Sequence, residues 1–248
     1  MFNDSKVCGH VVVNDRWGKD ERHIHGGYYT TEYGVGLPDS SHAWEENRGI
    51  GYSFGLNRAE NLSDYASGQR LVLSLIDTVS RGGNLLLDIG PAADGTIPAV
   101  MQDRLAHIGN WLKYNGEAIY GTTMFRSGAQ WTAGQRPSLD YKQDFRSPYD
   151  VMKLLAVPNA GMARKEVLFT RKADVLYAIV PVYPAGALTL RTLDLPPGAR
   201  VRLLGSNTGQ LNWKQAGRDV VVEVPPLRPG QLAFEDAYVF RIEGVAAR

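Results

Sequence analysis

The spacing of apolar positions changes character about half-way along the chain. Apolar residues at positions 71, 72, 75, 76 and 79 have the spacing of one helix face, and Gly82 and Gly83 follow to end that helix. A second predicted helix runs from Pro98 to Gly116. Between them, residues 84–90 ("NLLLDIG") predict a strand buried on both sides, and shorter runs predict strands at 10–16, 49–54 and 118–122. This alternation predicts βα units and a parallel sheet over residues 1–122.

From residue 123 onwards the pattern is different. Residues 123–160 are polar, aromatic and irregular, which predicts a long loop or linker. In 161–248, turn-forming residues separate short stretches of alternating apolar and polar positions: 166–172, 175–183, 187–193, 200–205, 220–225 and 237–243. This spacing is typical of an antiparallel β-sandwich. The predicted fold class is therefore α/β followed by all-β.

Composition narrows the function classes. The 248 residues are 44% hydrophobic and carry a formal net charge of +1, so neither nucleic-acid binding nor electrostatic membrane docking is expected. No apolar run approaches the roughly 20 residues that span a bilayer. The first ten residues do not read as a signal peptide, which predicts a cytoplasmic location. Cys8 is the single cysteine, and His23 and His25 have no third ligand nearby, so no disulfide, metal or cofactor is predicted.

Polar side chains gather where the strands of the first part are predicted to end. Ligands bind beyond the carboxyl ends of parallel strands, so these residues are candidates for a site. They are Asn14, Asp15, Arg16, Trp17, Glu32, Trp44, Glu45, Phe54 and Asp88. Two carboxylates can cleave a glycosidic bond, while an arginine and aromatic rings hold the sugar.

Each of these residues also has a structural interpretation. Asp15 and Arg16 could form an ion pair within the fold, and Trp44 could belong to the core. Glu45 could lie at the start of a solvated helix. Asp88 follows an apolar strand, so its carboxylate needs either a partner or a raised pKa.

Five stretches occur in a fixed order along the chain: "VVVNDRWG", "TTEYG", "WEENRGIGYSFGLNRAEN", "LIDTVSRGGNLLLDIGPAADGTIP" and "RLAHIGNWLKYNGEAIYGT". In this order they resemble the α-L-fucosidases of glycoside hydrolase family 29. The resemblance covers about residues 1–122, and residues 161–248 are similar to the family's C-terminal sandwich. It implies half of a (β/α)8-like barrel followed by a β-sandwich. It also implies release of α-linked L-fucose with retention.

The resemblance also implies roles for individual residues. Arg16 matches a sugar-contacting arginine, and Phe54 matches an aromatic residue of the fucose pocket. Glu32, in "TTEY", matches the general acid/base of a bacterial subgroup, while Glu45 matches the position that has this role in other branches. The residues predicted to bind the substrate are Arg16, Trp17, Trp44, Phe54 and Asp15.

Two departures from the family qualify this prediction. The family's first four barrel strands, with the aspartate nucleophile in a Trp-x-Asp motif, have no match in this sequence. Asp88 stands where the family usually has Asn, so it is a candidate substitute nucleophile, as are Glu45 and Asp15. Exposed strand edges predict a homo-oligomer that covers the open half-barrel. We expect a weak α-L-fucosidase; the alternative is a non-catalytic fucose-binding or assembly module, or an inactive fragment.

Overall fold

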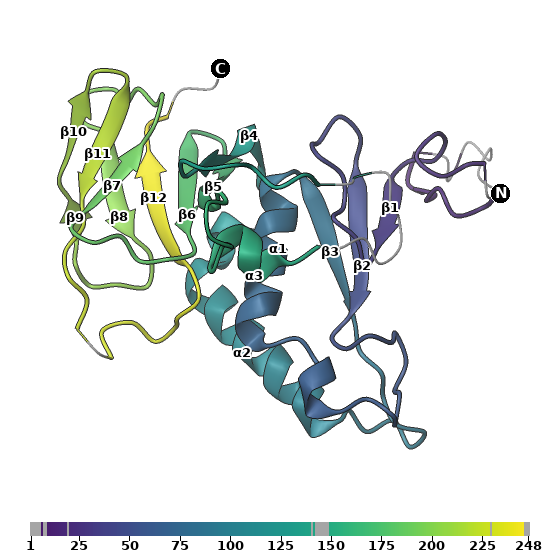
Figure 1. Ribbon diagram of the computed structural model, residues 1–248. Helices are drawn as coiled ribbons and strands as arrows, with labels where there is room; N and C mark the ends of the chain where they lie inside the picture. The colour runs from purple at the N-terminus through teal and green to yellow at the C-terminus, as the bar shows by residue number, and fades with distance from the viewer. Residues whose placement is uncertain are drawn as a thin grey trace.

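Helices separate two sheet-bearing parts of the chain (Figure 1). The computed structural model describes residues 6, 9–18, 20–139, 141, 149–228 and 230–245. Helix α1 (Gly68–Ser80) contacts the small N-terminal sheet on one side and strands of the C-terminal part on the other. Helix α2 (Ala99–Asn115) packs against α1. Both helices were predicted from the apolar spacing, and the structure confirms them.

The small sheet has three parallel strands in the order β1 (Tyr29–Glu32), β2 (Trp44–Gly49) and β3 (Gly83–Asp88). The short helix η1 (Leu62–Asp64) and α1 connect β2 to β3, which makes one βα unit. Only the loop 33–43 connects β1 to β2, and it contains no helix. The parallel sheet is therefore confirmed, but only one of its two crossovers is helical.

Three strand predictions are wrong, because no strand forms at those bounds in the described residues. Residues 10–16 form only an isolated parallel bridge, between Asn14 and Tyr28. Val12 is 68% exposed there, because a β-branched run at a sheet edge has nothing to pack against. The strand expected at 49–54 lies earlier, as β2, and the segment 118–122 contains the end of helix η2 (Gly116–Ala118) and a turn.

The strand at 84–90 exists as β3, but it is not buried on both faces. On one face, Leu87 packs against a cluster that contains Leu71 of α1 and Met101 of α2. On the other face, Leu86 is 49% exposed. The prediction failed because an apolar run indicates a buried strand without showing which of its faces is covered.

The C-terminal part consists of two antiparallel sheets, as predicted. The larger has the order β4 (Thr123–Trp131), β5 (Lys165–Lys172), β6 (Val175–Val180), β12 (Tyr238–Glu243), β8 (Arg200–Leu203) and β9 (Gln210–Leu211). The smaller has the order β10 (Trp213–Ala216), β11 (Asp219–Glu223) and β7 (Ala187–Leu190). Strand β4 and helix α3 (Val151–Leu155) lie where a long loop was expected. In β4 a bulge between Met124 and Ala129 interrupts the apolar alternation, which hides the strand from sequence analysis.

Two hydrophobic clusters lie on opposite faces of the larger sheet. Leu176 and Ala178 of β6 point into the cluster between the two sheets, whereas Tyr177 and Ile179 point toward the helices. The second cluster takes its residues from α1, α2, α3 and strands β5, β6 and β12. Strand β6 is therefore a continuous apolar run because both of its faces are covered.

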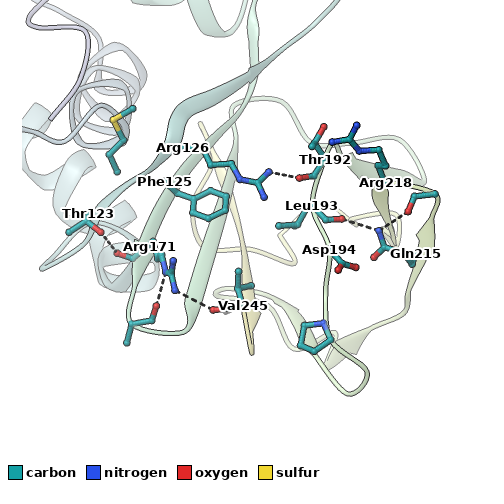
Figure 2. Close-up of a pocket in the computed structure, with 14 residues that line it drawn as sticks. Thr123, Phe125, Arg126, Arg171, Thr192, Leu193, Asp194, Gln215, Arg218 and Val245 are labelled. Atoms are coloured by element: carbon teal, nitrogen blue, oxygen red, sulfur yellow. Dashed lines mark hydrogen bonds between the residues drawn. The ribbon is translucent and has the colours of Figure 1, made fainter. Parts of the chain in front are cut away.

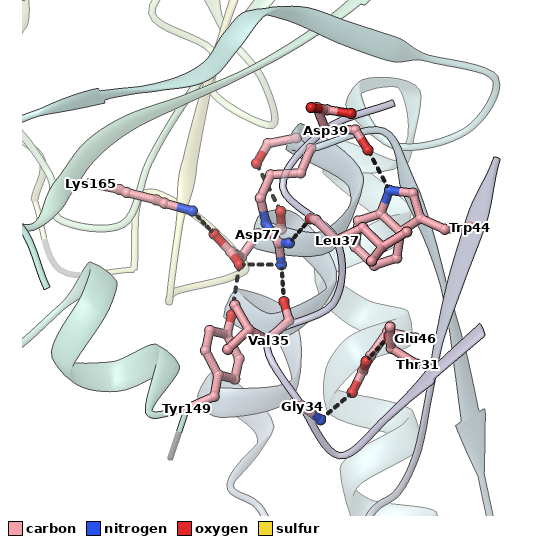
Figure 3. Close-up of polar contacts among 12 residues, drawn as sticks. Thr31, Gly34, Val35, Leu37, Asp39, Trp44, Glu46, Asp77, Tyr149 and Lys165 are labelled. Atoms are coloured by element: carbon pink, nitrogen blue, oxygen red, sulfur yellow. Dashed lines mark hydrogen bonds and ion pairs between the residues drawn. The ribbon is translucent and has the colours of Figure 1, made fainter. Parts of the chain in front are cut away.

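A buried polar network also links α1 to the larger sheet. Asp77 of α1 accepts hydrogen bonds from Lys165 Nζ at 2.5 Å, Arg81 Nη2 at 2.9 Å and the Tyr149 hydroxyl at 2.6 Å (Figure 3). Burial alone would raise the pKa of Asp77, but the charges of Lys165 and Arg81 outweigh it and hold that pKa well below its usual range. Burial lowers the pKa of Lys165 and raises that of Tyr149 well above its ordinary value.

Candidate active site

One face of the small sheet carries three of the predicted catalytic carboxylates. Glu45 of β2 lies opposite Thr30 of β1 and Asn84 of β3, and Asn47 lies opposite Glu32. Side chains alternate along a strand, and register partners in a parallel pair share a face. The open face therefore comprises Thr30, Glu32, Glu45, Asn47, Asn84, Leu86 and Asp88. Glu32 and Asp88 are the last residues of β1 and β3, whereas Glu45 is the second residue of β2 and lies near the start of that strand rather than at its carboxyl end.

The opposite face of the sheet carries a different carboxylate with a structural role. Glu46 is 2% exposed and accepts hydrogen bonds from the Thr31 hydroxyl and from Gly34 N at 3.1 Å (Figure 3). It also accepts from Arg48 Nη2 at 2.6 Å. These bonds satisfy a buried charge. In the dipeptide Glu45–Glu46, the strand places only Glu45 on the open face.

Arg16 holds the end of β1 in place. Its Nη1 donates to Glu32 Oε2 at 2.8 Å, and its Nε donates to Thr30 Oγ1 at 2.7 Å. The side chains of Arg16 and Glu32 remain 33% and 20% exposed. The pair therefore has a fixed geometry and stays accessible to a ligand on the open face.

Asp15, which was predicted to bind substrate, instead forms a structural corner. It is 1% exposed, and its Oδ1 accepts from Thr30 N at 3.0 Å and Thr30 Oγ1 at 2.8 Å. Its Oδ2 accepts from His23 N at 2.9 Å. Both carboxylate oxygens are engaged, which removes Asp15 from the candidate substrate contacts and nucleophiles. It fixes the chain next to Arg16.

Trp44 also differs from its prediction as a substrate contact. It is 0% exposed, its Nε1 donates to Asp39 O at 2.9 Å, and the Arg81 guanidinium lies 5.1 Å from its ring centroid. A Cβ at Gly36 or Gly83 would overlap the ring. Trp44 is therefore a core residue, as its alternative interpretation held.

Glu45 is a partly buried carboxylate on the open face. Burial raises its pKa, although a hydrogen bond with Asn47 and the charge of Arg16 act in the opposite direction. A raised pKa keeps a carboxyl group protonated closer to neutral pH, which suits a proton donor. Sequence analysis did not single out Asn47; its spacing of two residues from Glu45 on one strand is the signal that could have found it.

Tyr33 and Phe54 form an aromatic pair close to the end of β2. The rings of Tyr33 and Phe54 are 5.0 Å apart, and the Tyr33 hydroxyl accepts from Gly49 N at 2.9 Å. Burial raises the pKa of Tyr33, and the negative charges of Glu60 and Asp88 act in the same direction. Tyr33 was not predicted, although it directly follows Glu32. Its positive φ of 52° turns the chain away from the strand.

Trp17 is 72% exposed and directly follows Arg16, so its ring is accessible to a ligand. Within the described ranges, no group of three or more His, Cys, Asp or Glu side chains could hold a metal ion. No helix in the same ranges is long and apolar enough to cross a bilayer.

Comparisons with known proteins find relatives over most of the chain. A family model described as Alpha-L-fucosidase matches residues 1–117, and one described as Alpha-L-fucosidase C-terminal domain matches residues 161–243. An α-L-fucosidase of Branchiostoma floridae is 36% identical over 250 residues, covering 99% of this chain and 48% of the relative. Human tissue α-L-fucosidase is 33% identical over 251 residues, covering 99% of this chain and 47% of the relative. The chain thus spans about half the length of these relatives.

A solved structure gives the same result. The α-fucosidase of Thermotoga maritima, in complex with a mechanism-based inhibitor, aligns with a TM-score of 0.67 and 31% identity. The alignment covers 94% of this chain and 45% of that structure. The fold and the matched models are those of a glycoside hydrolase. More narrowly, the chain belongs to the α-L-fucosidase family.

Proposed function

We propose that residues 1–122 supply half of a (β/α)8-like barrel whose open face forms part of an α-L-fucosidase site. The supporting features are three parallel strands in sequential order, helix α1 on one face, and carboxylates on the other. In a closed barrel that second face would point to the interior, where the carboxyl ends of the strands carry the catalytic groups.

The proposed reaction is hydrolysis of an α-L-fucoside to L-fucose and an alcohol. One carboxylic acid donates its proton to the glycosidic oxygen while a carboxylate attacks the anomeric carbon, which forms a covalent fucosyl ester. Water, deprotonated by the first carboxylate, then attacks the anomeric carbon and releases the nucleophile. Retention requires the two carboxyl groups to lie about 5–5.5 Å apart.

Glu32 is our proposed acid/base, and Glu45 is the alternative for the same role. The observation that carries the assignment is the ion pair of Glu32 with Arg16 at the edge of the open face, where both side chains remain accessible. Arg16 would contact a sugar hydroxyl with its remaining N–H groups. The raised pKa of Glu45 supports the alternative. Phe54 and Trp17 would provide apolar faces for the sugar.

Asp88 is our proposed nucleophile for this chain. It lies in the register of the open face, opposite Gly49 and two residues beyond Leu86. The motif of the family nucleophile has no match here, so we expect slow turnover by family standards.

A second candidate is a module that binds fucose without hydrolysing it. The feature that favours it is the accessibility of two side chains that can hold a sugar: Arg16 is 33% exposed and Trp17 is 72% exposed. Binding would then need Arg16 and the aromatic side chains but no nucleophile.

The test is hydrolysis of an aryl α-L-fucoside by the 248-residue chain and its Glu32→Gln, Glu45→Gln and Asp88→Asn variants. Turnover that collapses in Glu32→Gln and not in Glu45→Gln supports the assignment; the reverse moves the role to Glu45. Azide should restore turnover to a variant that lacks the nucleophile, giving a fucosyl azide. Fucose binding without turnover supports the second candidate, and absence of both would refute both.

We further propose a homo-oligomer in which a second copy of the chain completes the open half-barrel and leaves the carboxyl ends of the strands accessible to substrate. Leu86, 49% exposed in the middle of β3, is an apolar side chain that such a contact would bury.

A further inference from the structure

A cavity lies in the sandwich, in a different part of the molecule from the open face. It has a volume of about 1040 Å³ and is bounded by β4, the turn after β5, the chain after β7 and the turn between β10 and β11 (Figure 2). Ligand pockets commonly measure roughly 300–1,000 Å³, so the cavity can hold more than a single small group.

The cavity carries uncompensated positive charge. Arg126, Arg171 and Arg218 line it together with one acidic residue, Asp194, whereas the whole chain has a net charge of only +1. Within the described residues, none of these three arginines has an ion-pair partner. Other arginines of the same part do, and they include Arg191, Arg200, Arg202 and Arg241.

Backbone carbonyl groups fix two of the guanidinium groups in place. Arg171 donates from Nε to Ala173 O at 2.7 Å and from Nη2 to Val245 O at 3.3 Å. Arg126 donates from Nη1 to Thr192 O across the cavity, and its guanidinium lies 4.9 Å from the centroid of the Phe125 ring (Figure 2). Each guanidinium has five N–H donors, so N–H groups remain for a ligand after these contacts. An arginine held in this way loses little entropy on binding an anion.

The backbone around the cavity is strained. Six non-glycine residues in the described ranges have positive φ, and three of them line this cavity: Arg126, Ala173 and Thr192, with φ between 52° and 54°. Such conformations cost free energy and gather at ligand sites. Here two of them, Arg126 and Thr192, face each other through their shared hydrogen bond.

The remaining lining indicates what kind of anion fits. Asp194 would repel a ligand with closely spaced negative charges, such as a nucleic-acid backbone. It can accept hydrogen bonds from hydroxyl groups, as can the hydroxyls of Thr123 and Thr192. Phe125 adds an apolar ring. These groups together suit a molecule with one anionic group and several hydroxyls.

We propose that this cavity binds an acidic saccharide, with its carboxylate or sulfate group on Arg126, Arg171 and Arg218. A guanidinium binds a carboxylate or sulfate through parallel N–H donors, and Asp194 orients the ring hydroxyls. The site is independent of the fucosidase proposal, because it shares none of the proposed catalytic residues.

The test is calorimetric titration of the full chain with a disaccharide of glucuronic acid and N-acetylglucosamine. The matched ligand has glucose in place of the glucuronic acid. We expect the acidic disaccharide to bind and the neutral one to bind at least about tenfold more weakly, since the neutral sugar cannot form charge-assisted hydrogen bonds with the arginines. Salt should weaken the binding.

Variants then locate the site. Arg218→Gln and Arg171→Gln should each weaken binding roughly tenfold. Arg200→Gln, an exposed arginine of β8 outside the cavity, should leave it unchanged, and so should Glu32→Gln. Equal binding of the two disaccharides, or no effect of the cavity variants, overturns the proposal. Displacement of the disaccharide by an equal concentration of a short polyaspartate peptide overturns its saccharide specificity. A sulfated galactose that binds more tightly than the uronate would identify sulfate as the anionic group.

Discussion

Replacing Asp77 with Asn should destabilise the protein more than removing any exposed charge on helix α1. The substitution leaves Lys165 and Arg81 buried, each about 4% exposed, without a carboxylate between them. Breaking a buried pair by removing one partner costs about 3–5 kcal/mol, because an uncompensated charge stays in the interior. Domains unfold with about 5–15 kcal/mol in total, so this loss is a large fraction of the stability.

The measurement is urea unfolding followed by circular dichroism. With a denaturant slope of about 2–3 kcal/mol per molar, the midpoint should fall by roughly 1–2.5 M. Arg70→Gln is the matched control on the same helix. Arg70 forms an ion pair with Asp150 at 3.7 Å, and both side chains are about 40% exposed. Loss of this exposed pair should lower the free energy of unfolding by less than about 1 kcal/mol. An Asp77→Asn shift no larger than that of Arg70→Gln would refute the reasoning. The double variant Asp77→Leu, Lys165→Met should recover part of the loss, because it removes one stranded charge.

Four other outcomes can be measured directly. The pKa of Asp77 in the folded state lies below its value of about 3.9 in the unfolded chain. The ionised Asp77 side chain therefore stabilises the fold fully above about pH 3.9, and this stabilisation is lost as the pH falls through the folded-state pKa. Urea midpoints measured at pH 7 and pH 3 should differ less in Asp77→Asn than in the parent. Trp44→Ala should lower the free energy of unfolding by about 3–5 kcal/mol, whereas an unchanged urea midpoint would contradict its place in the core. Arg16→Gln should lower kcat/KM for an aryl fucoside about 10- to 100-fold while the circular dichroism spectrum stays the same. Light scattering should give a mass twice that of the 27.3-kDa chain, as expected for a dimer. Leu86→Glu should convert this dimer to a monomer, and a parent protein that is already monomeric would contradict the proposed contact.

Regular periodicity made much of the fold predictable. Helices α1 and α2 and most sandwich strands follow from apolar spacing alone, because each has one continuous face against a core. Strand β4 was missed because its bulge breaks the alternation of two. Residues 10–16 were mistaken for a strand because β propensity depends on burial of the strand against its neighbours, and Val12 stays 68% exposed.

The candidate site was predictable only in part. Motifs singled out Glu32, Glu45 and Asp88, and the strand register places all three on one face of the sheet, with Glu45 near the start of its strand. They could not separate Asp15 from these carboxylates, because its burial depends on Thr30 and His23, which are distant in sequence. The burial of Trp44 likewise depends on Arg81, which approaches it only in the folded chain.

The cluster shared by the helices and the larger sheet has a consequence for how the chain can be divided. Its side chains come from both sides of residue 122: Val72, Ile76 and Trp111 from the first part, and Leu168, Ile179 and Val239 from the second. The cluster beneath the parallel sheet is much smaller and contains only three fully buried residues in the described part of the chain, so most of the apolar contacts of α1 and α2 belong to the cluster shared with the larger sheet. The sandwich is therefore not a detachable module. Separating the parts by proteolysis or recombination at residue 122 would expose apolar surface on both pieces, so we expect the two parts to unfold as a single cooperative unit.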